Sequence, residues 1–339
     1  MIPAPLQRAP IMPDIDRRAL IAGSAAAALT SALSWAAVPK AAVQGPGVHR
    51  TKLGDYQLTA IDDGTWFLKI DDDFVRNADA GAVNRALAAA FLPPNILPVS
   101  FTVLLVNTGS KLVMIDAGTG GQIADTAGLM LANLAVAGIE PKAVDTIVVS
   151  HFHPDHINGL KTKDGDKVFP NAEILVPEPE WSFWMDDARM NAAPDRIKVY
   201  FRNARRIFND IEKEVRRFKP GVEVAPGITS IPAFGHTPGH TAFSIASRNQ
   251  SVLSLGDAVR NPYLFARYPD WQPLFDMDGP LAVKTRRQML DRAASNRMLV
   301  EAYHFPFPAC GHIVKNGKGY ELVPAPWQPL EPDRPQRAG

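Results

Sequence analysis

The sequence predicts an α/β fold in which two β-sheets pack face to face and helices cover their outer surfaces. Short apolar runs typical of strands occur in both halves of the chain, and helical periodicities lie between and after them. Several of these strands end at a histidine or an aspartate. The pattern of elements alone does not select this arrangement over other α/β folds.

The first half of the chain carries a predicted strand at 56–61, followed by a turn at Asp62-Asp63-Gly64. Residues 70–98 are proline-rich toward their end and predict a mostly irregular segment. Two further strands, 101–107 and 111–116, flank Thr108-Gly109-Ser110, which is a hairpin signal.

The middle of the chain combines helices with one short buried strand. Gly120-Gly121 precedes a predicted helix that runs to Ala137 and ends at Gly138. The run from Asp145 to Ser150 predicts a buried strand. Apolar residues at steps of three and four predict an amphipathic helix over 195–218.

The last part of the chain again alternates strands with a helix. The apolar runs predict strands at 241–246, 251–255 and 298–302, and a helix at 281–295. The segment after Val323 is rich in proline and predicts an extended tail on the surface.

The overall composition is that of a globular protein with a substantial core, since 46% of its 339 residues are hydrophobic and 21% are charged. The net charge of +1 gives no electrostatic reason to expect nucleic acid as a partner. The single cysteine, Cys310, excludes an internal disulfide and a metal site built from several thiolates. Any metal site must therefore use histidine and carboxylate ligands.

The N-terminus predicts an export signal of the twin-arginine type, because Arg17-Arg18 precede an uncharged stretch rich in alanine, leucine and serine. A membrane anchor is disfavoured, since the many alanines make this stretch poorly apolar for a spanning helix. We therefore expect residues 1–42 to be signal and linker, with cleavage near Ala36. Residues 43–339 would form one periplasmic domain without stable membrane insertion.

The segment directly after the 145–150 strand carries the strongest chemical signal. His151, His153, Asp155 and His156 fall within six residues. Neutral imidazoles and carboxylates are ligands for zinc, iron, manganese and cobalt. Half of the eight histidines would have to cluster by chance in a loop without function. The cluster therefore predicts a metal site.

Three later residues follow predicted strands or strand-like runs. His236 lies in Gly235-His236-Thr237-Pro238-Gly239-His240, Asp257 follows an apolar strand, and His304 follows the 298–302 strand. A single histidine or aspartate is more often structural than functional. The order and spacing of these three residues after the first cluster make the whole set specific.

Together these segments resemble the dinuclear metallo-β-lactamase superfamily, and within it the methyl parathion hydrolase-like branch. The stretches that carry the closer likeness are 106–113, 236–241 and 304–313. The likeness extends from about Leu53 to Val323, and it implies a four-layer αβ/βα sandwich with the metal site at one edge of the sheets.

The resemblance also implies how two divalent ions would be held. One ion would take His151, His153 and His236, the other Asp155, His156 and His304, and Asp257 would bridge the two. Zinc is the expected metal, with cobalt, manganese or iron as alternatives. Asp155 and Asp257 would be the catalytic residues, and a hydroxide that bridges the two ions would attack the substrate.

Two residues would support this ligand set according to the resemblance. Asp116, in Met114-Ile115-Asp116-Ala117-Gly118, would orient a ligand histidine, although a turn aspartate is an equally good interpretation. The family uses the first histidine of the Gly-His-Thr-Pro-Gly-His segment, so His240 would be supporting and His236 the ligand.

Aromatic and apolar side chains would line the substrate pocket in that branch, although each could equally be ordinary core packing. Ile123 stands where members of the branch carry a phenylalanine, which puts the shape of an aryl pocket in doubt. The candidate pocket residues are Phe74, Ile123, Trp181, Phe183, Trp184, Tyr200, Phe201 and Phe265.

The function expected from the resemblance is hydrolysis of a small neutral ester: a phosphotriester such as methyl parathion, an aryl ester or a lactone. An acyl-homoserine lactonase is the alternative enzyme, because it would use the same seven ligands. A protein that binds metal without catalysis is the alternative of another class. A homodimer is expected by resemblance only.

Overall fold

The computed structural model describes residues 40–41 and 44–330, and all of its helices and strands lie between Val48 and Pro324. The predicted signal segment lies outside the described residues except for residues 40 and 41, so export stays a prediction. None of the helices in the described part is long and apolar enough to cross a membrane.

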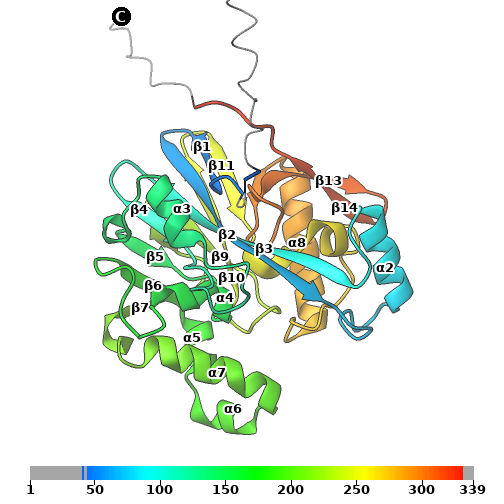
Figure 1. The fold of residues 1–339 in the computed structure, drawn as a ribbon, viewed down its shortest axis with the longest axis horizontal. Helices are drawn as coiled ribbons and strands as arrows, with labels where there is room; N and C mark the ends of the chain where they lie inside the picture. The colour runs from blue at the N-terminus through cyan, green and yellow to red at the C-terminus, as the bar shows by residue number, and fades with distance from the viewer. Residues whose placement is uncertain (1–39, 42–43, 331–339) are drawn as a thin grey trace, which may run out of the picture. The chain divides into compact units, whose positions relative to one another are not determined.

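The first sheet contains seven strands in the order of the chain (Figure 1). Its first four strands pair antiparallel, and its last four pair parallel. The strands are β1 (Val48–Leu53), β2 (Tyr56–Lys69), β3 (Ile96–Asn107), β4 (Leu112–Ile115), β5 (Thr146–Val148), β6 (Glu173–Pro177) and β7 (Val215–Phe218).

The second sheet also contains seven strands, in the order β14-β13-β12-β11-β10-β9-β8. Only the pair β11 and β12 is parallel, and helix α8 connects these two strands. The strands are β8 (Glu223–Ala225), β9 (Ile228–Pro232), β10 (Thr241–Ser247), β11 (Gln250–Ser254), β12 (Leu299–Glu301), β13 (Cys310–Asn316) and β14 (Gly319–Pro324).

Three apolar cores join these sheets and the helices into four layers. One core lies between the sheets, where Leu104 and Val148 of the first meet Phe243 and Val252 of the second. Another fills the space between the first sheet and its helices, and a third lies between the second sheet and α8. The helices are α2 (Ala80–Ala89), α3 (Met130–Val136), α4 (Pro154–Ile157), α5 (Glu178–Trp184), α6 (Asp187–Ala192), α7 (Asp195–Phe208) and α8 (Gly279–Ser295).

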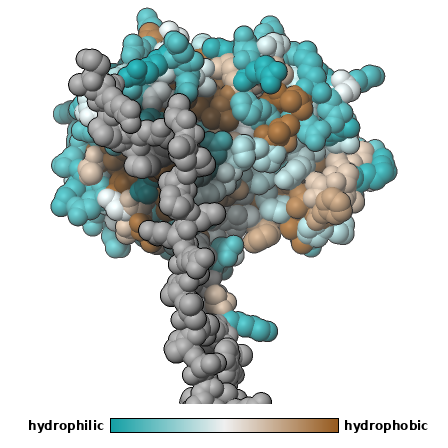
Figure 2. Space-filling view, turned by 90° about the horizontal axis from the view of Figure 1, so that it is seen from above, coloured by the Kyte–Doolittle hydropathy of each residue, from teal (hydrophilic) through white to brown (hydrophobic). Residues whose placement is uncertain are grey.

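This arrangement confirms the predicted αβ/βα sandwich, and the strands predicted around the hairpin and in the second half lie within one or two residues of the observed ones, except that β3 begins at Ile96. On the face shown in Figure 2, hydrophobic residues form separate patches among hydrophilic ones, as is usual for a protein surface.

The predicted turn at 62–64 is wrong, because β2 continues through it with a bulge between Asp62 and Gly64. The buried carboxylate of Asp63 accepts hydrogen bonds from the backbone and hydroxyl of Thr119 and from the backbone of Met130. Gly64 adopts a φ of +104°, which L side chains rarely adopt. The bulge thus holds the 119–130 loop against the sheet.

The predicted helix over 120–137 is wrong in its first half, where Gly120, Gly121 and Gly128 all have positive φ; only Met130–Val136 is helical. The segment 70–98 is more regular than predicted, because Asp79 caps an alanine-rich helix, α2.

The amphipathic helix over 195–218 ends at Phe208, and Val215–Phe218 instead forms β7 beside β6. The apolar residues of this segment continue the helical spacing but lie on a short strand. Pairing with β6 stabilises that strand.

Candidate metal centre

Seven side chains from both sheets converge at the carboxyl ends of four strands. The strands β5, β9, β11 and β12 each end shortly before one or more of these residues, so their loops meet at one edge of the sandwich. The seven side chains are His151, His153, Asp155, His156, His236, Asp257 and His304.

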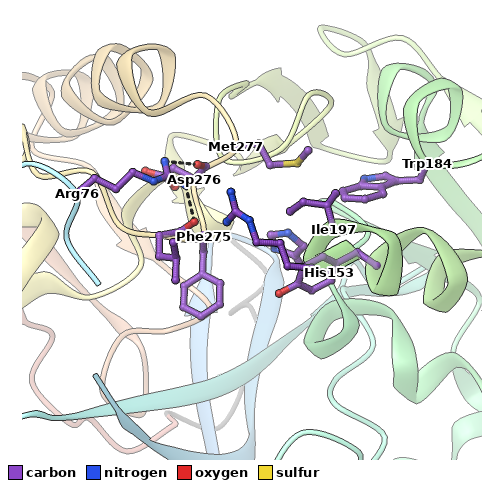
Figure 3. A pocket seen from close by; sticks show the side chains of 10 residues that line it. Arg76, His153, Trp184, Ile197, Phe275, Asp276 and Met277 are labelled. Carbon is purple, nitrogen blue, oxygen red and sulfur yellow. Dashed lines mark hydrogen bonds between the residues drawn. The ribbon is translucent and has the colours of Figure 1, made fainter. Parts of the chain in front are cut away.

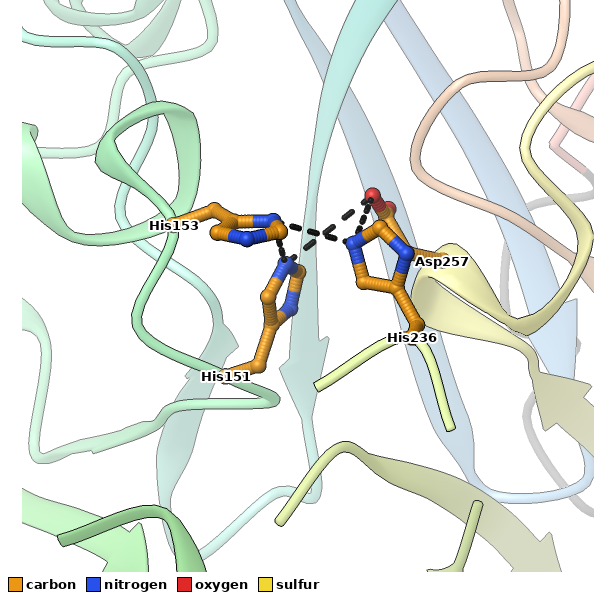
Figure 4. Close-up of side chains that lie close together, drawn as sticks. All are labelled: His151, His153, His236 and Asp257. Carbon is orange, nitrogen blue, oxygen red and sulfur yellow. Dashed lines mark hydrogen bonds and ion pairs between the residues drawn. The ribbon is translucent and has the colours of Figure 1, made fainter. Parts of the chain in front are cut away.

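Four of them form one group, in which the side chains point toward one another (Figure 4). The His153 Nδ1 atom lies 3.0 Å from His151 Nε2 and 2.9 Å from His236 Nε2. The Asp257 Oδ2 atom lies 3.1 Å from His236 Nε2 and 3.9 Å from His151 Nε2. All four residues are buried.

The second group consists of Asp155, His156 and His304. The Asp155 Oδ2 atom lies 3.5 Å from His156 Nε2 and 3.4 Å from His304 Nε2. Asp257 reaches this group as well, because its Oδ1 lies 3.3 Å from His156 Nε2 and its Oδ2 lies 3.2 Å from His304 Nε2. Asp257 therefore stands between the two groups.

The donor atoms fit metal ions better than they fit one another. Within the described part of the chain, the buried His156 Nε2 and Asp257 Oδ1 form no hydrogen bond, although they lie 3.3 Å from each other. Two nitrogens bound to one tetrahedral zinc lie roughly 3.3 Å apart, given bonds of about 2.0–2.1 Å. The separations of 2.9–3.9 Å in the first group bracket that value.

Outer hydrogen bonds fix which nitrogen of each histidine faces the centre. His156 Nδ1 lies 2.7 Å from an oxygen of Asp116, and His236 Nδ1 lies 2.9 Å from an oxygen of Asp276. These contacts leave the Nε2 atom of each ring to face the centre, as carboxylate partners of metal-binding histidines do. The structure thus places Asp116 where the resemblance implied, in a backbone conformation with a φ of +60°.

Asp276 is the counterpart of Asp116 on the other side of the centre, and sequence reasoning missed it. Its second oxygen accepts a hydrogen bond of 2.7 Å from Arg286, and both side chains are buried. Nothing in the local sequence Leu274-Phe275-Asp276-Met277 indicates a role, because Asp276 follows no strand and belongs to no histidine cluster.

His240 does not face the centre, because both of its ring nitrogens contact the backbone. Its Nδ1 lies 3.0 Å from the oxygen of Ala233, and its Nε2 accepts a hydrogen bond of 2.9 Å from the backbone nitrogen of Asp257. Burial lowers the pKa of His240 to about 3, so the ring is neutral and can accept this bond. His240 therefore positions Asp257.

A buried carboxylate that sequence reasoning also missed, Glu180 on α5, joins three segments around the centre. One oxygen accepts hydrogen bonds from the backbone of Phe152 and the indole of Trp184, and the other accepts them from the hydroxyl of Thr237 and the backbone of Gly239. Glu180 therefore fixes the two histidine loops relative to each other.

A cavity of about 240 Å³ opens beside His153 (Figure 3). Its walls come from the 274–277 segment and from α5 and α7, with Trp184 and Ile197 facing Asp276 and Met277 across it. A much smaller cavity of about 10 Å³ lies beside His304, and Phe275 lines both.

The predicted pocket residues divide into two sets. Trp184 and Tyr200 line the larger cavity, and Phe74 and Phe265 line the smaller one. The other four belong to the core that includes the first sheet or pack against it, and they line neither cavity. These four are Ile123, Trp181, Phe183 and Phe201.

The sequence matches the family profile of the metallo-beta-lactamase superfamily over residues 97–304, a span that contains all seven convergent side chains. The chain belongs to the metallo-beta-lactamase superfamily. It is a metal-dependent hydrolase with the paired histidine and aspartate groups of a dinuclear site.

The chain is similar to two proteins that are named as hydrolases or lactonases. The chain is 21% identical over 265 residues to an N-acyl homoserine lactonase of Bacillus cereus, a match that covers 73% of this chain and 92% of the relative. It is 27% identical over 186 residues to a probable metallo-hydrolase of Mycobacterium tuberculosis, covering 46% of this chain and 56% of that protein.

Two solved structures of the superfamily superpose over most of the chain. One is AidC, a dizinc quorum-quenching lactonase in complex with a product, at 26% identity and a TM-score of 0.79, covering 84% of this chain and 99% of that one. The other is the hydrolase AbOPH, at 28% identity and a TM-score of 0.79, covering 85% of this chain and 100% of that one.

Proposed function

We propose that this enzyme hydrolyses a lactone or a related small neutral ester, with N-acyl homoserine lactones as the first substrates to test. The observation that carries the proposal is the cavity of about 240 Å³ that adjoins His153 and is walled largely by apolar side chains. Likeness to two lactonases, one by sequence and one by structure, supports the same reaction class.

The seven convergent residues would hold two divalent ions in the arrangement that the resemblance implies, with zinc expected first. When bound, such ions supply hydroxide at neutral pH and stabilise negative charge that develops on a substrate oxygen. Asp116 and Asp276 keep the Nδ1 protons of His156 and His236 in place. Glu180 holds the two histidine loops at a fixed separation.

The size of the cavity bears on the substrate. Its volume is below the roughly 300–1,000 Å³ typical of ligand pockets. We therefore expect short acyl chains such as hexanoyl to be preferred over dodecanoyl, because a longer chain would have to leave part of its apolar surface in water.

A phosphotriester is the second candidate, and the aromatic walls formed by Trp184 and Tyr200 favour it. An aryl leaving group can pack against such rings. The same cavity would then hold the aryl group where the first proposal places the acyl chain. We further propose that the chain is exported to the periplasm and forms a homodimer.

The deciding experiment compares kcat/KM of the zinc-loaded chain on hexanoyl and dodecanoyl homoserine lactone, dihydrocoumarin and methyl parathion. The proposal predicts the highest value on a lactone, and loss of activity on chelation that added zinc restores. Highest efficiency on methyl parathion would favour the phosphotriester reaction instead. A metal-loaded chain that turns over none of these esters would contradict both.

A further inference from the structure

A buried arginine, Arg260, lies at the candidate metal centre but is not one of the seven convergent residues. Arg260 directly follows the short helix Gly256–Val259, which contains Asp257. Its side chain is nine-tenths buried. Its Nε lies 3.5 Å from Asp257 Oδ2, and its Nη2 lies 3.5 Å from His304 Nε2.

These contacts are long for a buried guanidinium, which usually donates to carboxylates at roughly 2.7–2.9 Å. Arg286 provides the comparison within the same molecule. It donates a hydrogen bond of 2.7 Å to Asp276 and hydrogen bonds of 2.7–3.1 Å to three backbone carbonyls. All of these partners belong to the fold itself. The two polar contacts that the described residues offer Arg260 are both at the edge of hydrogen-bonding distance.

Arg260 lines the smaller cavity beside His304. Its guanidinium packs over the ring of Phe275 at 4.4 Å, and Phe275 lines both cavities beside the centre. Arg260 therefore contacts a residue that the two cavities share.

A loaded centre would take away both polar contacts of Arg260. Asp257 and His304 would give their lone pairs to metal ions, and the cations would repel the guanidinium. Two divalent ions, the carboxylates of Asp155 and Asp257 and the guanidinium of Arg260 together leave a positive formal charge. Such a site favours ligands that carry or develop negative charge.

We propose that Arg260 is a substrate-binding residue that donates hydrogen bonds to the oxygen anion formed when the ester is hydrolysed. The proposal rests on the proposed function, because hydrolysis of either a carboxylic ester or a phosphotriester ends in an anionic product. Arginine suits this role, since its planar donors match the two oxygens of a carboxylate or phosphate.

The test separates charge recognition from mere packing by using two ligands of nearly equal shape, hexanoate and hexanamide. Their dissociation constants are measured calorimetrically on zinc-loaded wild type, Arg260→Met, Arg260→Lys and the surface control Arg248→Met, with zinc content determined for each. Arg260→Met keeps an apolar stem against Phe275 but removes every donor.

We expect Arg260→Met to weaken hexanoate binding at least about tenfold while hexanamide changes less than about twofold. Arg260→Lys should restore part of the hexanoate affinity, and Arg248→Met should leave both values unchanged. Equal losses for the two ligands, unchanged hexanoate binding, or loss of zinc from Arg260→Met would each overturn the proposal. Charge-selective loss in a chain that hydrolyses no ester would instead contradict only the proposed function.

Discussion

The loop after β5 brings four convergent side chains to the centre from six consecutive residues, whereas the second sheet brings three from the ends of three different strands. Local backbone geometry, including the short helix α4, positions the first set. The second set depends on the register of β9, β11 and β12 and on buried partners such as Asp276 and His240.

The candidate ligands of the second sheet are therefore positioned by contacts between residues far apart in the sequence. A single substitution can remove each of these contacts. Asp276 and Arg286 form a buried ion pair behind His236, and His240 holds the backbone of Asp257. Substitutions of these supports should therefore reveal how far the centre depends on the fold.

Asp257→Asn should cause the largest loss, because Asp257 contacts histidines of both groups. The substitution keeps the shape and removes one negative charge from between the two candidate ion positions. We expect kcat/KM to fall at least roughly 100-fold, with at least one metal ion lost or bound loosely. Elemental analysis and kinetics on the best ester check this, and two retained ions with near-normal turnover would contradict the bridging role.

His236→Ala should reduce metal binding far more than His240→Ala. The Nε2 atom of His236 lies 2.9 Å from His153 Nδ1 inside the first group, whereas both nitrogens of His240 contact the backbone. Zinc content after dialysis against a weak chelator measures the difference. Similar losses in the two variants would mean that His240 matters as much for the metal centre as His236.

The difference between the loop after β5 and the second sheet also explains which residues of the centre the sequence predicts. His151, His153, Asp155 and His156 could be identified from their density alone, while His236, Asp257 and His304 needed the family resemblance. Asp276 and Glu180 escaped both arguments, because their roles arise from contacts 40 and 59 residues away along the chain. The strands were predicted more accurately than the glycine-rich 120–129 loop, whose positive φ angles depend on tertiary packing.

Asp116→Asn and Asp276→Asn form a matched pair, since each carboxylate holds the Nδ1 proton of one histidine. Both should lower metal affinity by roughly 10- to 100-fold, the effect typical of outer partners. Asp276→Asn should destabilise the fold more than Asp116→Asn, because it leaves the buried guanidinium of Arg286 without its charge partner, whereas the partners of Asp116 at Ser150 are neutral. Zinc titration and chemical unfolding check this, and equal stability of the two variants would show that the ion pair contributes little.

Glu301→Gln should have the smallest effect on activity but should change how stability depends on pH. Glu301 lies on β12, and one of its oxygens accepts a hydrogen bond of 2.6 Å from Ser254 on β11. Burial raises the pKa of this carboxyl to about 8 from an ordinary value of 4.5. The folded chain therefore holds a proton there that the unfolded chain releases between about pH 4.5 and pH 8.

This proton determines the direction in which the stability of the fold changes with pH. Because the folded state binds more protons in this window, the wild type loses stability as the pH rises through it, by at most about 1.4 kcal/mol per pH unit. Glutamine resembles the protonated acid and does not titrate, so the stability of Glu301→Gln relative to wild type should increase from pH 5.5 to pH 8. Urea unfolding of the zinc-loaded proteins at both values measures this, with the exposed Glu140→Gln as a control that should show no such trend. A constant difference between Glu301→Gln and wild type would mean that Glu301 is already ionised in the folded chain at pH 5.5.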